Sequence, residues 1–205
     1  NLGLGTNMDL AIVGEGFFNI SSNANELEPN SPLYTRSGRF MVDSSNTYIV
    51  DPFGRKLFGF PVDANGNITS TQMQALQTKD YASVAFQDGG LLVGDPESDN
   101  PVPLFKVAIA TMQNKQGLVS TTGGAYKTTI SSGEAFTAKT SGDTIGTDSS
   151  NVYGEIFTES VESANVDVSK VALDMSLLNR GFSANNAVVD DITKIISEFI
   201  KKIGG

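Results

Sequence analysis

The sequence contains no histidine and no cysteine, and these two absences exclude much of the chemistry that proteins perform. The chain cannot form a Ser-His-Asp triad or a Cys-His nucleophile, and it cannot build a zinc site from Cys and His ligands. Disulfides are excluded as well, so the folded state must be stabilised by packing. We therefore expect a protein that is not an enzyme.

Long apolar runs and clusters of positive charge are also missing. No run approaches the roughly 20 apolar residues that span a bilayer, and no basic segment followed by an apolar one opens the chain as a secretory signal would. The 14 Lys and Arg residues are scattered and the net charge is −9, which disfavours nucleic acid because its phosphates require clustered basic side chains. We expect no membrane insertion and no nucleic-acid partner.

Residues 1–165 are predicted to form a mainly β domain, an irregular arrangement of short antiparallel strands. Segments rich in β-branched and aromatic residues recur between turn signals, as is typical of all-β domains. Turns are expected at Gly14-Glu15-Gly16 and at Asn65-Gly66, where a two-residue hairpin would suit two residues that tolerate positive φ. Residues 95–103 and 131–150 are predicted to be exposed loops. The predicted strands are 10–13, 17–20, 39–42, 48–50, 56–62, 83–87, 91–94, 104–112, 126–130 and 152–159.

Residues 166–205 are predicted to form one long amphipathic helix of the coiled-coil type that serves assembly. Asp167 or Ser169 is the expected N-cap. Beyond it, apolar spacings of four and three alternate as a heptad seam, and at about 1.5 Å per residue the helix would extend roughly 50 Å. The seam consists of Val171, Met175, Leu178, Phe182, Asn185, Val189, Ile192, Ile196, Phe199 and Ile203.

Two residues of this helix are unusual for a simple core element. Gly181 costs about 1 kcal/mol relative to Ala in a helix interior, so it either permits close approach of another backbone or marks a kink. Asn185 is a polar residue in the seam, where it can fix the register of packing. The seam can pack on the β-domain of the same chain or on other molecules. We favour other molecules because the stripe is longer than such a domain can cover.

Three sequence patterns resemble known ligand-binding or catalytic sites but are better interpreted as structural features. Gly14-Glu15-Gly16 lacks the third glycine of a nucleotide loop and precedes a strand, so it indicates a tight turn. Residues 63–67 begin like a calcium loop, but its later positions do not follow the pattern, which favours a hairpin turn. Asp190-Asp191 lies off the seam and is interpreted as a solvated face instead of a glycosidase pair. We expect no cofactor, no metal and no small-molecule substrate.

Several stretches resemble signature sequences of bacterial flagellar rod and hook proteins. Residues 8–18 are similar to the family's signature near the start of its β-domain, and residues 34–40 resemble its Tyr-Thr-Arg-x-Gly-x-Phe. Residues 163–168 and 179–185 resemble its Ser-Asn-Val-Asp and Gln-Arg-Gly-Phe-x-Ala/Ser-Asn, and 114–118 is a weaker match in which Lys115 replaces the usual Pro. The motif residues are Asp9, Leu10, Ala11, Gly14, Gly16, Phe17, Phe18, Tyr34, Thr35, Arg36, Gly38, Phe40, Asn165, Val166, Asp167, Arg180, Gly181 and Phe182.

The resemblance implies a structural subunit of the flagellar hook, a homo-oligomer that self-assembles into a helical tube and transmits torque from rod to filament. The distal rod protein of the basal body is the alternative: the Arg-Gly-Phe motif favours hook, while the short chain suits a compact hook or a rod protein. An adhesin or other binding module on a coiled-coil stalk is the rival from another class.

The resemblance also implies a location and partners. The protein would lie in the extracellular hook or basal body, contact other flagellar axial proteins, and be exported by the flagellar type III channel without a cleavable signal. Family members begin with a further helix that pairs with the C-terminal one. This chain starts after the point where that helix should end, so we expect a truncated or processed chain.

Overall fold

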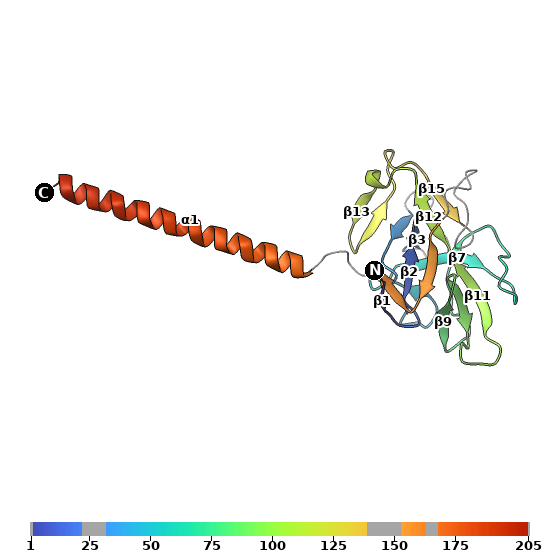
Figure 1. Ribbon diagram of the computed structural model, residues 1–205. Helices are drawn as coiled ribbons and strands as arrows, with labels where there is room; N and C mark the ends of the chain where they lie inside the picture. The colour runs from blue at the N-terminus through green and yellow to red at the C-terminus, as the bar shows by residue number, and fades with distance from the viewer. Residues whose placement is uncertain (1, 22–31, 139–152, 163–167, 205) are drawn as a thin grey trace. The chain divides into compact units, whose positions relative to one another are not determined.

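The computed structural model describes residues 2–21, 32–138, 153–162 and 168–204 (Figure 1). The chain divides into two compact units, Asn1–Ser163 and Ala164–Gly205. The first is built from antiparallel strands and is called the β unit here. The second contains one helix and is called the helix unit. The predicted fold class, mainly β with a single long C-terminal helix, is confirmed.

The strands of the β unit form one large sheet and two separate pairs, all antiparallel. The main path of the large sheet runs β13–β14–β4–β3–β7–β11–β10–β9. These strands are β13 (Val119–Thr121), β14 (Ala125–Lys127), β4 (Leu33–Thr35), β3 (Phe17–Ser21), β7 (Lys56–Pro61), β11 (Val102–Val107), β10 (Leu91–Gly94) and β9 (Val84–Gln87). Attached to this path are β5 (Met41–Val42), β6 (Ile49–Val50), β8 (Gln74–Ala75), β12 (Ile109–Met112) and β15 (Ala135–Ala138).

The two separate pairs bring together early and late segments of the β unit. β2 (Leu10–Val13) pairs with β16 (Glu155–Thr158), and β1 (Leu2–Leu4) pairs with β17 (Ser160–Glu162). The last described strand before the helix unit is therefore hydrogen-bonded to the first strand of the chain. Both pairs join segments about 150 residues apart in sequence. Closing so long a loop costs conformational entropy, which the contacts of these strands must offset.

The β unit encloses its own hydrophobic core. Phe18 on β3 and Phe58 on β7 are fully buried, and the rings of Phe18 and Phe40 pack edge to face at a centroid distance of 5.4 Å. Because side chains alternate along a strand, Phe17 joins a second, smaller cluster with Tyr34, Ala110 and Met112. Burying each such large side chain contributes about 1.5–3 kcal/mol, so packing stabilises this unit without disulfides.

Several expected strand boundaries are wrong where the chain changes its pairing partner. The single strand predicted at 104–112 is two strands, because β11 pairs with β7 and β10 whereas β12 pairs with β3 and β15. Residues 131–150 are not all loop, since β15 lies within them; 139–152 fall outside the described residues. In the predicted strand 39–42 only β5 is formed, and in 126–130 only the part within β14 is extended.

The turn at Asn65-Gly66 is present but is not the two-residue hairpin expected. Only Gly66 has a positive φ, at 80°. The loop spans Asp63 to Asn67, closed by a hydrogen bond from the Asp63 N–H to the Asn67 carbonyl at 2.9 Å. The Asp63 carboxylate accepts the backbone N–H groups of Asn65 and Asn67, each at 2.9 Å. A longer loop organised by an Asp side chain replaces the tighter turn.

The helix unit is a single helix, α1 (Val168–Ile203), of 36 residues. It passes through Gly181 without interruption and is drawn as a straight rod in Figure 1, so nothing supports a kink at this glycine. Ser169 lies inside the helix and is not its N-cap, while Asp167 falls outside the described residues. None of the described helical residues belongs to a segment long and apolar enough to cross a membrane.

Candidate assembly surface

The first two sequence motifs meet at the turn between β2 and β3. Gly14 and Gly16 have positive φ values of 108° and 136°. The guanidinium of Arg36 donates hydrogen bonds to the carbonyl oxygens of Ile12 (3.0 Å), Gly14 (3.0 Å) and Gly16 (2.7 Å). The chain thus bends sharply between β2 and β3, and Arg36 holds this bend through three carbonyl oxygens.

The same two motifs meet a second time at Asp9 and Gly38. The Asp9 carboxylate accepts the backbone N–H of Thr6 at 2.7 Å and its hydroxyl at 3.0 Å, while the Leu10 N–H donates to the Gly38 carbonyl at 2.8 Å. A Cβ on Gly38 would lie 1.5 Å from the Leu10 carbonyl oxygen, so no side chain fits there. These motif residues hold the β unit together.

Tyr34 and Thr35 extend this structural role across the sheet. Tyr34 is buried, and burial raises its pKa to about 12 because the charged phenolate is poorly solvated. The Thr35 hydroxyl donates to the Gly124 carbonyl at 3.2 Å and accepts the Ser37 N–H at 3.0 Å. The remaining motif residues of the β unit, Ala11, Phe17, Phe18 and Phe40, are all buried.

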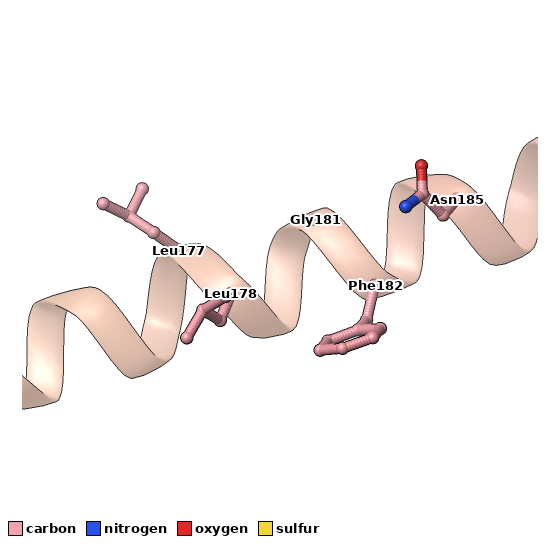
Figure 2. A pocket seen from close by; sticks show the side chains of 5 residues that line it. All are labelled: Leu177, Leu178, Gly181, Phe182 and Asn185. Atoms are coloured by element: carbon pink, nitrogen blue, oxygen red, sulfur yellow. The ribbon is translucent and has the colours of Figure 1, made fainter.

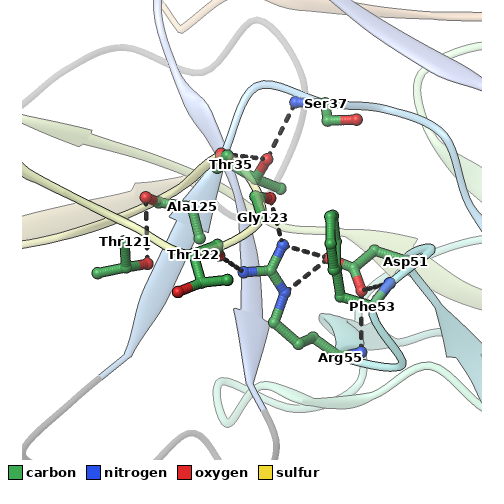
Figure 3. A network of polar contacts seen from close by, with 10 residues as sticks. Thr35, Ser37, Asp51, Phe53, Arg55, Thr121, Thr122, Gly123 and Ala125 are labelled. Carbon is green, nitrogen blue, oxygen red and sulfur yellow. Dashed lines mark hydrogen bonds and ion pairs between the residues drawn. The ribbon is translucent and has the colours of Figure 1, made fainter.

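A buried polar cluster in the β unit could not be predicted from the sequence (Figure 3). The Asp51 carboxylate accepts the backbone N–H groups of Phe53 and Arg55, each at 2.9 Å, and pairs with the Arg55 guanidinium. Arg55 also donates to the carbonyl oxygens of Thr122 (3.0 Å) and Gly123 (2.8 Å). The Asp and Arg side chains are only 3% and 12% exposed. This cluster fastens the β6–β7 turn to the β13–β14 hairpin.

The weaker motif at 114–118 forms a short turn in which Lys115 has a partner. Lys115–Gly117 is a 3₁₀ turn capped by Asn114, whose side chain accepts the Gln116 N–H at 3.1 Å. Lys115 forms an ion pair with Glu15, the central residue of the Gly14-Glu15-Gly16 turn. The departure from the motif pattern therefore places a cation beside an acidic turn, with both side chains about half exposed.

The helix unit, described by itself, leaves its seam uncovered. The exposed fractions of the seam's large apolar side chains range from 51% at Ile192 to 68% at Ile203. The exposed seam side chains are Met175, Leu178, Phe182, Val189, Ile192, Ile196, Phe199 and Ile203. Nothing is described for the side chain of Val171. The motif residues Asn165, Val166 and Asp167 lie outside the described residues.

The apolar surface of α1 is wider than the predicted seam. Leu177, Val188, Ile195 and Ile200 are 57–66% exposed and lie outside the heptad positions chosen from the sequence. A heptad spacing selects a single narrow line of positions along a helix, so it does not include the apolar residues that flank that line. A helix with so wide an apolar surface must pack against more than one neighbouring element to bury it.

A hollow lies on α1 at the late motif (Figure 2). It is lined by Leu177, Leu178, Gly181, Phe182 and Asn185, so it includes two motif residues and three seam residues. Arg180, which precedes Gly181 in this motif, is exposed on the helix and lines a separate depression. The structure thus places Gly181, Phe182 and Asn185 of this motif at the apolar hollow, and Asn179, Arg180 and Ser183 at the other depression.

The acidic residues Asp63, Asp190 and Asp191 lie in two different settings. Hydrogen bonds from the backbone N–H groups of Asn67 and Asn65 lower the pKa of Asp63, which organises its loop. Asp190 and Asp191 are exposed on α1, and Asp191 lies 3.6 Å from Lys194. Among the described residues, no three or more Asp or Glu side chains gather where they could hold a metal ion.

Comparisons with known proteins identify relatives of one kind. The flagellar basal-body rod protein FlgG of Bacillus subtilis is 27% identical over 197 residues, 96% of this chain and 65% of the relative. FlgG of Buchnera aphidicola is 24% identical over 196 residues, 93% of this chain and 63% of the relative. The flagellar hook protein FlgE of Escherichia coli is 25% identical over 134 residues, 65% of this chain and 31% of the relative.

The match to these relatives is partial. No protein-family model matches the chain, and the chain spans less than two thirds of the length of the rod relatives. The resemblance to flagellar rod and hook proteins is confirmed, at modest identity over most of the chain.

Proposed function

We propose that this chain is a structural protein of the bacterial flagellar axis that assembles with further copies of itself through α1. The observation that carries the proposal is the exposed apolar seam of a 36-residue helix. The β unit has a buried core of its own, so it does not need the helix to complete its packing. Rod and hook proteins among the relatives support an axial, non-enzymatic role.

The energetics of the seam favour association. Burying each large apolar side chain contributes about 1.5–3 kcal/mol, and eight exposed ones are described along the seam. Loss of translational and rotational freedom opposes association by roughly 4–15 kcal/mol. The seam is therefore large enough to drive assembly when most of it is covered. Head-to-tail contacts that do not close into a ring produce a helical filament, which is the form we propose.

Within the axis, we propose the hook as the location and the distal rod as the second candidate. The motif Arg180-Gly181-Phe182 favours the hook. The rod relatives favour the rod, because their similarity extends over 93–96% of this chain, whereas that of the Escherichia coli hook protein covers 65%. Either location implies neighbouring axial proteins as partners, transmission of torque, and export through the flagellar channel.

The test is to make the seam polar in the full-length protein. The double variant Ile192→Asp with Ile196→Asp introduces two charges into the seam, and we expect filaments or hooks to be absent by negative-stain electron microscopy. The matched control is Ser183→Asp with Ser197→Asp, which adds the same charge to the same helix away from the seam and should leave assembly intact. Circular dichroism should show a folded β unit in both variants. Normal assembly of the seam variant would refute the proposal.

A further inference from the structure

Three turns of the β unit share one geometry, and this geometry restricts their fourth residue. Each turn begins with an Asp whose carboxylate accepts the backbone N–H of the fifth residue and whose carbonyl oxygen accepts that of the fourth. The fourth residue has a positive φ, which favours Gly or Asn. The turns are residues 43–47, 51–55 and 63–67, and their fourth residues are Asn46, Gly54 and Gly66, with φ values of 56°, 77° and 80°. In the third turn this glycine directly follows an asparagine, Asn65.

Asn65-Gly66 is the one Asn-Gly pair in the sequence, and an asparagine in this setting is chemically labile. The glycine nitrogen attacks the side-chain carbonyl carbon of the asparagine, and the new C–N bond closes a succinimide ring. The bond to the side-chain amide nitrogen breaks, and that nitrogen leaves as ammonia together with the proton of the glycine N–H. Water then opens the ring at either carbonyl carbon, which produces aspartate or isoaspartate. Glycine favours the attack because it has no Cβ to hinder its nitrogen.

The Asn65 side chain is accessible to this reaction. It is exposed, and within the described residues it forms no hydrogen bond. A Cβ on Gly66 would lie 3.8 Å from the Leu91 side chain, an ordinary contact distance, so the space beside this glycine is open. Asn46 of the first turn is followed by the β-branched Thr47, whose N–H is bound by a carboxylate at 2.7 Å. Asn65 therefore has the more reactive neighbour.

The turn that contains Asn65 also restrains the reaction. The N–H of Gly66 donates to the Asp63 carbonyl oxygen at 3.0 Å, and the Asp63 carboxylate accepts the N–H groups of Asn65 and Asn67 at 2.9 Å. The Gly66 nitrogen therefore has to leave these contacts before it can attack the side chain beside it. The negative charge of Asp63 also opposes loss of the proton from this nitrogen. The rate should thus follow local opening of the turn, which Asp63 controls.

We propose that Asn65 is a site of spontaneous covalent modification, deamidation with water as the only co-reactant, and that Asp63 sets its rate. The aspartate product places a second carboxylate beside that of Asp63, and the isoaspartate product lengthens the backbone of a turn that Val62 and Ile68 close as a β-bridge. The inference depends on the β unit alone. It is therefore independent of the proposed assembly through α1.

The first experiment measures where the unaltered chain deamidates. The protein is incubated in mildly alkaline, heavy-oxygen water, so that every newly formed carboxylate carries the label, and is then digested for peptide mass spectrometry. We expect labelled acid at Asn65 several-fold faster than at Asn46, the exposed asparagine of the equivalent turn. Equal rates at the two positions would overturn the assignment of Asn65.

The second experiment tests control by Asp63. Asp63→Ala removes both the charge and the acceptor, and we expect the rate at Asn65 to rise several-fold. Asp43→Ala is the matched control, because it makes the same change in the turn at 43–47, and it should leave the rate at Asn65 unchanged. Circular dichroism should show both variants folded. If Asp63→Ala deamidates at the rate of the unaltered chain, the role of Asp63 is refuted.

A third measurement needs no variant and therefore does not depend on whether Asp63→Ala folds. The unaltered chain is incubated folded and in concentrated urea, where the turn is absent. We expect the rate at Asn65 to be several-fold higher in urea, because the Gly66 nitrogen is then released from its contacts. An equal rate in the two states would contradict restraint by the turn.

Discussion

In the β unit, large apolar side chains such as Phe18 and Phe58 are fully buried, whereas along α1 the seam side chains are 51–68% exposed. The glycines differ in the same way. Gly38 is required by a backbone oxygen of its own unit, and Gly181 is required by nothing within its own unit. The β unit buries its large apolar side chains by itself, whereas the helix unit, described by itself, leaves its own exposed.

The largest effect is expected at the buried Asp51–Arg55 pair, whose contacts all lie within the β unit. Arg55→Ala leaves the Asp51 carboxylate buried without its cation, and breaking such a pair costs about 3–5 kcal/mol. Urea denaturation of the unassembled chain should show this loss of stability. Arg39→Ala, at an exposed arginine, is the control and should change stability by about 0.5 kcal/mol or less. Equal effects of the two variants would show that the pair does not hold the hairpin.

The next largest effect is the difference in stability change between alanine substitutions at a glycine of the β unit and at one of the helix unit. Gly38→Ala forces a methyl group onto the Leu10 carbonyl and should destabilise the β unit by about 1–3 kcal/mol or more. Gly181→Ala should not destabilise the unassembled chain, because its methyl group meets no atom and alanine favours the helix. Thermal unfolding followed separately in the near and far ultraviolet measures both. The comparison fails if the two substitutions change stability in the same direction.

A pH dependence is expected from Tyr34 in the β unit. Its pKa is about 12 in the folded state and near 10 in an unfolded chain, so folding favours the neutral phenol. This contribution to stability is fully present below about pH 10 and is lost as the pH rises toward about 12. Denaturation midpoints measured across this range should fall, and the fall should be smaller in Tyr34→Phe. An identical pH profile for the two proteins would contradict the assignment.

The smallest effect is expected at the surface pair of Lys115 and Glu15. Both side chains are about half exposed, and exposed ion pairs contribute about 0–1 kcal/mol because water and salt screen them. Lys115→Ala should therefore change the free energy of unfolding only slightly, and the change should vanish in high salt. A larger or salt-independent effect would show that the turn depends on Lys115 for its shape.

Local patterns predicted some features of this chain well. The heptad spacing located α1, because a helical period depends on neighbours three and four residues apart. The apolar segments located β2, β3, β7, β9 and β10 nearly to their ends. The signature sequences identified the relatives, although the sequence did not reveal that Arg36 links the two early motifs through carbonyl oxygens.

Features that depend on distant partners could not be predicted in the same way. The pairing partners change at Ala108: β11 before it pairs with β7 and β10, and β12 after it pairs with β3 and β15. No residue type at this position indicates a break between two strands. β15 lies in a polar stretch and is a strand because β12 offers it an edge. The Asp51–Arg55 cluster acquires its importance from the carbonyl oxygens of Thr122 and Gly123, 67 and 68 residues away from Arg55.

Hydrogen exchange of the full-length protein before and after assembly tests most directly whether the seam is covered by other copies. In the unassembled protein we expect amides of residues 175–203 to exchange rapidly while the core strands β3, β7 and β11 stay protected. On assembly, the helix amides should become protected and those of the core strands should change little. If the helix amides are equally protected in both states, the seam is not covered by assembly, and the account is contradicted.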